Sequence, residues 1–174
     1  MTAIDELMQH CKKMGLKRSL LMSRFYRFHR RNPALLDFLL QELVTLRQNN
    51  WPTTSFEMLW HHARWVLTYH RVSGESFSVC QNFMPHYSRL AIILFPEFNG
   101  FYRLKSAKAD KDFGVQIAST KKAEELRRLQ WVDGTPIESG WRPSASYVIP
   151  SNPVPRRAPV QRTVFTPEDS RRPQ

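Results

Sequence analysis

The sequence predicts a mainly α protein: a small helical bundle with a short β-hairpin that would fit a winged-helix arrangement, and a disordered C-terminal arm. Large apolar residues recur at helical spacing in three stretches, 33–48, 56–69 and 83–95, and eight of the twelve prolines lie beyond residue 134. The chain therefore divides into an N-terminal amphipathic helix at 1–16, a helical domain at 17–134 with a hairpin at 101–117, and a Pro/Arg-rich extended or disordered arm at 135–174.

The composition indicates a negatively charged partner. The 174 residues carry a formal net charge of +11, and the sequence pI is about 10.2. An excess of Lys and Arg favours polyanions, nucleic acid first and then an anionic membrane or an acidic protein surface. Two cysteines in a chain rich in apolar residues fit a reducing cytoplasm, and the sequence shows neither a secretion signal nor the roughly 18 apolar residues of a membrane span. We expect a cytoplasmic protein that does not enter a membrane.

The first helix is predicted by its cap. Thr2 and Asp5 stand three residues apart, as the two residues of a capping box do, and Gly15 offers a C-cap. The apolar residues between them predict one buried face: Ile4, Leu7, Met8, Cys11 and Met14.

The segment 17–31 is the leading candidate for a contact surface. Leu21, Phe25 and Phe28 fall on one face of the expected helix, and three arginines fall on an adjacent face. No acidic residue interrupts the segment, so its cations repel one another unless an anion or an acidic partner accompanies them. The group consists of Lys17, Arg18, Arg24, Arg27, Arg30 and Arg31.

Each of the next two apolar stretches begins with a cap. Asn32 precedes the first, and Thr54 with Glu57 forms a capping box before the second. The second helix turns Arg64 and Trp65 outward, a pair that can stack on a base or cap an interface.

The third apolar stretch has the form of a recognition helix, with polar side chains early and apolar ones beneath. Its outward residues are expected to be Gln81, His86 and Arg89. The gap before this helix is much longer than the three or four residues of a helix-turn-helix, so the winged-helix arrangement is a hypothesis.

Beyond residue 100 the pattern changes. Alternation over 101–104 and the apolar stretch at 113–117 predict a hairpin with a basic loop, and a charged helix is expected at 120–130. The arm has too few bulky apolar residues to offset the entropy of ordering. The cations offered to phosphates are Arg103, Lys105 and Lys108 in the hairpin and Arg142, Arg156 and Arg157 in the arm.

No motif carries a catalytic mechanism or a cofactor. The sequence lacks a phosphate-cradling Gly-rich loop, a Cys-x-x-Cys, a His-Glu-x-x-His and a nucleophile elbow. His61 and His62 are adjacent, whereas zinc ligands on a helix normally stand four residues apart, so we predict no metal site. We expect a non-enzymatic protein without a cofactor; the weakest alternative is a nuclease that uses His61, His62 or His86 as a base.

Three pieces stand in order between residues 25 and 104. They are Arg27-Phe28-His29-Arg30-Arg31-Asn32-Pro33, His62-Ala63-Arg64-Trp65, and Tyr87-Ser88-Arg89-Leu90 leading to Pro96-Glu97-Phe98-Asn99-Gly100-Phe101. Together they resemble a family of small phage- and prophage-encoded proteins. The resemblance implies a phage or mobile-element origin, and hence the cytoplasm of a host cell, and it implies no particular activity.

Two functions follow as alternatives. The first is a phage-type DNA-binding protein, a regulator in one version, that holds the phosphates of duplex DNA with the cations of 17–31 and reads or stacks with Arg64, Trp65 and Arg89. The second is a phage-encoded inhibitor or adaptor that binds a host protein or nucleoprotein complex, such as a defence system or a polymerase, through the same basic face and the arm.

Overall fold

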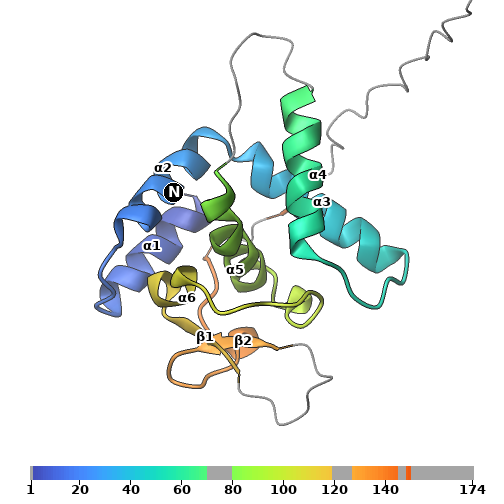
Figure 1. Cartoon of the computed structure of the whole chain (residues 1–174). Helices are drawn as coiled ribbons and strands as arrows, with labels where there is room; N and C mark the ends of the chain where they lie inside the picture. The colour runs from blue at the N-terminus through green and yellow to red at the C-terminus, as the bar shows by residue number, and fades with distance from the viewer. Residues whose placement is uncertain (1, 70–79, 119–126, 145–147, 150–174) are drawn as a thin grey trace, which may run out of the picture.

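The computed structural model describes residues 2–69, 80–118, 127–144 and 148–149 (Figure 1). Within them the fold is mainly α, with six α-helices and one antiparallel sheet of two short strands, so the predicted fold class is confirmed. The elements are α1 (Ala3–Lys13), α2 (Leu20–Arg31), α3 (Ala34–Gln48), α4 (Phe56–Tyr69), α5 (Met84–Leu94), α6 (Lys108–Phe113), β1 (Val115–Ile117), β2 (Leu129–Trp131) and the short 3₁₀ turns η1 (Gln81–Phe83), η2 (Pro96–Phe98) and η3 (Ile137–Ser139).

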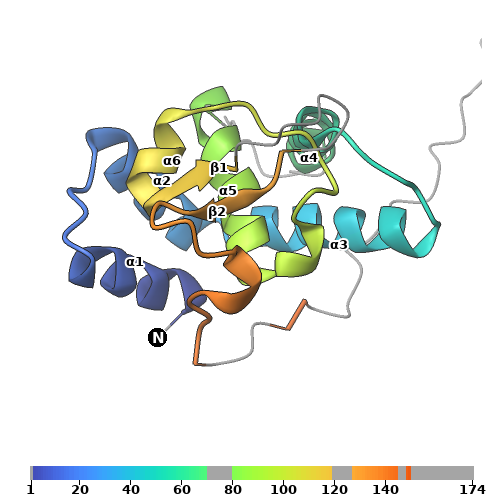
Figure 2. The same cartoon turned by 90° about the horizontal axis from the view of Figure 1, so that it is seen from below.

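Helix α5 is the centre of the molecule. It lies between α2 and α4 in Figure 1, and the view from below keeps it between them (Figure 2). Its residues 86–93 are all buried. The prediction of a recognition helix is therefore wrong, because a helix enclosed by the rest of the fold has no face to offer to DNA. His86 and Arg89, expected to point outward, are 1% and 3% exposed.

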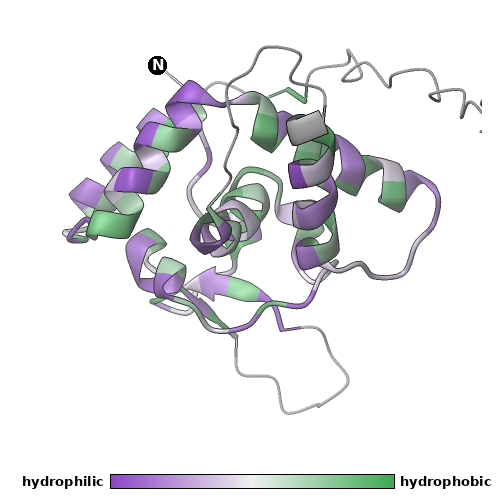
Figure 3. Cartoon of the chain, turned by 45° about the horizontal axis from the view of Figure 1, so that its top comes forward, coloured by the Kyte–Doolittle hydropathy of each residue, from purple (hydrophilic) through white to green (hydrophobic). Residues whose placement is uncertain are grey.

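The surrounding helices are amphipathic and cover α5. In Figure 3 hydrophilic and hydrophobic residues alternate along their turns. Their apolar sides join one buried cluster with α5, to which α3 contributes Leu39 and Leu43 and α4 contributes Leu59 and Trp60. This packing fixes which face of each outer helix remains available to a partner.

Helix α1 is an integral part of this domain. Its predicted capping box is present, and Ile4, Leu7, Met8 and Cys11 are buried, whereas Met14 is exposed at the end of the helix. The boundary predicted after residue 16 is therefore wrong. The reason is that these four side chains belong to the same buried cluster as those of the other helices.

The first residues of the predicted arm also belong to the domain. Ile137 is fully buried, and the Trp141 ring stacks on His10 of α1 with the ring centres 5.5 Å apart. The backbone N–H and the hydroxyl of Ser144 both donate hydrogen bonds to the Glu6 carboxylate, at 2.8 and 2.9 Å. These contacts correct the prediction of an extended arm for 135–144. Residues 145–147 and 150–174 lie outside the described residues.

The prediction of a hairpin at 101–117 is wrong about which segments pair. Strand β1 pairs with β2, in the register Val115 to Trp131, and the stretch expected to be a basic loop contains α6. Residues 101–104 pack on α5 instead, where the Tyr102 hydroxyl donates a hydrogen bond to the carbonyl of Ser88 at 2.7 Å. The end of the helix expected at 120–130 is a strand, and its residues 120–126 lie outside the described residues.

Two of the predicted caps are wrong in detail. Asn32 closes α2, because its side-chain amide donates to the carbonyl of Phe28 at 2.9 Å, and α3 begins without a side-chain cap. At the start of α4 the backbone N–H of Met58 donates to the Ser55 hydroxyl at 3.4 Å, while Thr54 forms a bridge to Tyr102.

Candidate nucleic-acid interface

The cations predicted to form the contact surface lie on α2 and in the turn before it. The hydroxyl of Ser19 accepts a hydrogen bond from the backbone N–H of Met22 at 3.0 Å and so caps the helix. Helix α2 therefore begins at Leu20, three residues after the predicted start, and Lys17 and Arg18 precede it.

One face of α2 is fixed in the core and the opposite face is exposed. Met22, Phe25 and His29 are the buried residues. At about 100° per residue, three exposed arginines point directly away from them, rather than along an adjacent face as the sequence indicated. We call these three residues the α2 row: Arg24, Arg27 and Arg31.

Within the described part of the chain, no ion pair includes a cation of the α2 row. The ion pairs that form there lie on α4, between α3 and α4, between α5 and α6, and beside β2. The first turn of α2 has no acidic residue either. The three guanidinium groups therefore repel one another, and a bound anion would relieve that repulsion.

The side of α2 that faces α1 is different, because a carboxylate lies there. The guanidinium carbons of Arg18 and Arg30 lie 5.3 and 5.8 Å from the centre of the Tyr26 ring, within the range of a cation–π contact. The Tyr26 hydroxyl donates a hydrogen bond to Asp5 Oδ1 at 2.5 Å. This bond, with further bonds from Thr2, lowers the pKa of Asp5 to about 2. Asp5 is thus ionised at neutral pH and offsets part of the charge of Arg30.

His29 anchors the buried face of α2 in the last turn of the helix. Its Nδ1 lies 3.3 Å from the Tyr87 hydroxyl of α5, and its ring stacks on Phe25 with the ring centres 6.1 Å apart. Burial penalises the imidazolium form and lowers the pKa of His29 from 6.5 to about 4. The helix that carries the α2 row is therefore held by an imidazole that must remain neutral.

The lowered pKa of the buried His29 predicts a loss of folding stability in mild acid. The unfolded chain takes up the His29 proton near pH 6.5, whereas the folded chain does so only near pH 4, so stability present above pH 6.5 is lost as the pH falls toward 4. The full shift corresponds to about 3 kcal/mol. Urea unfolding between pH 7 and 4 should show this loss in the wild type and not in the variant His29→Gln. The exposed Lys111→Gln, outside the buried face of α2, is the control and should follow the wild-type curve; a His29→Gln curve parallel to the wild type would contradict the assignment.

Arg64 and Trp65 lie on a separate surface. They belong to α4, which Figures 1 and 2 place across α5 from α2. The Trp65 side chain is 65% exposed, and Arg64 Nη1 donates to Gln81 Oε1 at 3.3 Å. The structure therefore does not bring this predicted pair together with the α2 row.

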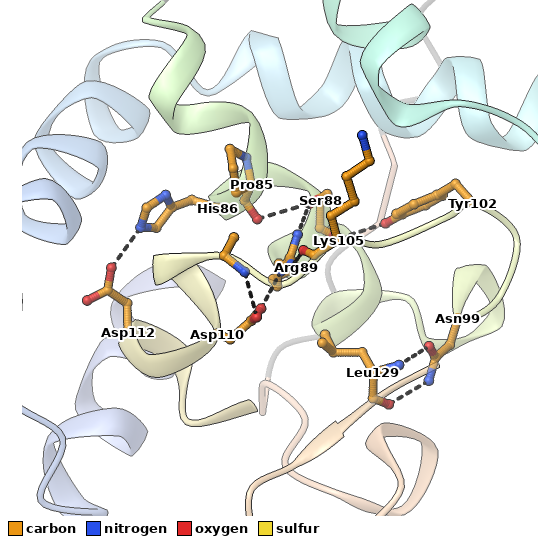
Figure 4. A network of polar contacts seen from close by, with 11 residues as sticks. Pro85, His86, Ser88, Arg89, Asn99, Tyr102, Lys105, Asp110, Asp112 and Leu129 are labelled. Atoms are coloured by element: carbon orange, nitrogen blue, oxygen red, sulfur yellow. Dashed lines mark hydrogen bonds and ion pairs between the residues drawn. The ribbon is translucent and has the colours of Figure 1, made fainter. Parts of the chain in front are cut away.

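Arg89 is a structural residue and not a contact residue. Its Nε donates to Asp110 Oδ1 at 2.8 Å, its Nη1 to the Ser88 hydroxyl at 3.0 Å, and its Nη2 to the carbonyl of Lys105 at 2.6 Å (Figure 4). One helical turn earlier on α5, His86 Nε2 lies 2.9 Å from Asp112 Oδ2 of α6. The prediction that Arg89 reads or stacks on DNA is wrong, because its guanidinium is directed to α6.

The remaining predicted cations are scattered. Arg103 and Lys105 are exposed on the segment that leads into α6, and Lys108 is exposed at the first position of that helix. Arg142 is exposed and donates from Nη2 to the carbonyl of Glu138 at 3.0 Å. Arg156 and Arg157 lie outside the described residues, so the arm contacts stay a prediction.

A catalytic site would need clustered or activated side chains among the described residues. No group of three or more His, Cys, Asp or Glu side chains among them is arranged to hold a metal ion. A cavity of about 310 Å³ lies between α1, the turn before α2 and α6, and Cys11 and Asp112 line it. Burial raises the pKa of Cys11 to about 11, so its thiol is not an activated nucleophile at neutral pH. His86, one of the three candidate bases, is enclosed in the core.

The chain matches no protein-family model, no curated protein and no solved structure. No helix in the described residues is long and apolar enough to cross a membrane. The assignment of a site therefore depends on the geometry alone. That geometry gives Asp5 and His29 roles beside α2 that the sequence did not indicate, because the contacts of Asp5 with Tyr26 and of His29 with Tyr87 join segments far apart in the chain.

Proposed function

We propose that this protein is a phage-type DNA-binding protein without enzymatic activity, which holds the phosphate backbone of duplex DNA with the outer face of α2. The observation that carries the proposal is the α2 row, three exposed arginines on one rigid face with no acidic partner among the described residues. Guanidinium groups bind phosphate oxygens in a bidentate manner. We expect Lys17 and Arg18, which are exposed in the turn before α2, to add further phosphate contacts.

The proposed binding depends on phosphates more than on bases. Helix α5, the one helix with the pattern of a recognition helix, is enclosed in the core, and its Arg89 is directed to Asp110. Phosphate contacts position a protein on DNA but carry no sequence information. We therefore expect affinity that falls steeply with salt and differs little between duplex sequences, which favours a DNA-coating or DNA-retaining role over that of a sequence-specific regulator.

The decisive experiment is a gel-shift titration of duplex DNA with the wild type and with a variant in which the α2 row is reversed in charge. Loss of the shifted band in the variant supports the proposal, and equal retention by both proteins overturns it. The same titration on two unrelated duplex sequences measures the sequence preference, which we expect to be less than about tenfold.

The second candidate function is that of a phage-encoded inhibitor or adaptor of a host protein or nucleoprotein complex. The feature that favours it is the lack of a base-reading helix beside the α2 row in the described residues, since an arginine row alone also fits an acidic protein groove. A pull-down from host lysate after nuclease treatment separates the two candidates. A protein partner survives the nuclease, whereas a partner retained through nucleic acid does not.

A further inference from the structure

Helix α4 has two faces with helical spacing, and one of them is exposed. Its inner face packs on α3 and α5. On the outer face four residues stand at i, i+3, i+4 and i+7, so they align along the helix. Two of them are large and apolar: Met58 is 49% exposed and Trp65 is 65% exposed. We call this set the α4 stripe: Met58, His61, His62 and Trp65.

One edge of the α4 stripe carries opposite charges at its two ends. Glu57 and Arg64 are exposed and stand seven residues apart, which is about two helical turns, so they share this edge. The pattern is therefore self-complementary between two antiparallel copies. When a second copy of α4 runs in the opposite direction, its Arg64 lies opposite Glu57 and its Trp65 lies opposite Met58.

We propose that the α4 stripe is the interface of a homodimer, in which two copies of α4 pack antiparallel about a two-fold axis near His61 and His62. Met58 of each copy then contacts Trp65 of the other, a favourable sulfur–aromatic pair. The two-fold axis brings the same edge of both helices together, so Glu57 of one copy meets Arg64 of the other, twice. In a parallel pairing the charged edges of the two copies would lie on opposite sides of the interface, so Glu57 and Arg64 could not pair.

The contacts that Glu57 and Arg64 make within one copy lie at the surface. The Glu57 carboxylate lies 4.0 Å from His61, with a side chain that is 61% exposed. The hydrogen bond from Arg64 to Gln81 is also at the surface. Exposed contacts of this kind contribute little, so exchanging them for contacts across the dimer costs little. The α2 row lies across α5 from the α4 stripe and stays accessible in the dimer.

Variants at Glu57 and Arg64 test both the antiparallel orientation of the helices and whether the partner is a second copy of the chain. Sedimentation equilibrium of the nuclease-treated full chain should show a concentration-dependent dimer. The variants Glu57→Arg and Arg64→Glu each place like charges together twice, and each should weaken the dimer at least tenfold. The double variant E57R/R64E restores opposite charges and should return the dimer Kd to within about threefold of the wild type. Failure of the double variant to recover would overturn the antiparallel arrangement.

The apolar part has its own matched control. Trp65→Ala removes the anchor of the stripe and should weaken the dimer by roughly 30-fold or more. Trp51 is 52% exposed but precedes α4, and Trp51→Ala should leave the dimer unchanged. Far-ultraviolet circular dichroism establishes that each variant is folded. A wild type that stays monomeric up to roughly 100 μM, or a dimer indifferent to Trp65→Ala, overturns the proposal. Neither outcome bears on DNA binding, because the α2 row is unchanged in every variant.

Discussion

Reversal of the α2 row, R24E/R27E/R31E, is expected to abolish the retention of duplex DNA. Each phosphate contact releases about 0.9 of a counterion, so the loss of three contacts alone lowers the affinity about 500-fold near 0.1 M salt. The reversed charges add repulsion to this loss. The arginines point away from the core, so the variant should keep the wild-type fold. A gel-shift titration, with circular dichroism on the same samples, measures both effects.

The effect of the net charge must be separated from the effect of where the charges lie on the protein. The variant K111E/R127E/R128E changes the net charge by the same amount at exposed positions outside the α2 row. It should weaken binding only a fewfold through the general field of the protein. The neutral variant R24A/R27A/R31A should also reduce the slope of log Kobs against log salt by about 3. Equal losses in the two reversed variants, or an unchanged slope in the neutral one, would refute a phosphate-binding row on α2.

The periodicity of the apolar residues was sufficient to place the outer helices. In α1 the capping box of Thr2 and Asp5 indicates the start of the helix. In α4 the three- and four-residue spacing of Phe56, Leu59, Trp60 and Ala63 indicates the inner face, and all four are buried. These are local signals, because residues three and four apart on a helix share a face whatever it packs against. The same reasoning placed the α2 row at the surface.

Periodicity failed where a helix is buried on every side. The pattern of α5 was interpreted as amphipathic because His86 and Arg89 are polar, and polar residues are usually exposed. Each instead has an acidic partner more than 20 residues later, Asp112 for His86 and Asp110 for Arg89. A pairing between segments so far apart depends on the tertiary fold, and a single sequence carries no sign of it.

The strands failed for a related reason. A short stretch of alternating apolar and polar residues does not indicate which strand it pairs with. The segment 101–104 shows the same alternation although it packs on a helix. The partner of β1 is set in part by Asn99, whose side chain accepts a hydrogen bond from the N–H of Leu129 at 2.8 Å and donates one to its carbonyl at 2.9 Å (Figure 4). These two hydrogen bonds hold the start of β2 against a loop 30 residues earlier in the chain.

The buried network yields the second large effect, on stability. Arg89→Ala removes a guanidinium that bonds Asp110, Ser88 and the carbonyl of Lys105 at once. Asp110 is then left as a largely buried carboxylate without its countercharge, and it also accepts the backbone N–H of Ala107 that starts α6. Breaking one half of such a pair costs about 3–5 kcal/mol, a large part of the 5–15 kcal/mol that holds a domain of this size together.

Urea unfolding followed by circular dichroism should therefore show Arg89→Ala as the most destabilised of the arginine variants. The exposed Arg27→Ala serves as the control and should change the free energy of unfolding by no more than about 0.5 kcal/mol. Arg89→Lys keeps the charge but cannot make three directed bonds from one plane, so it should fall between the two. The double variant R89A/D110A removes both charges and should cost less than the sum of the single variants. Additive losses would mean that the two groups do not interact in the folded protein, and an Arg89→Ala midpoint equal to the wild type would remove the network from the determinants of this fold.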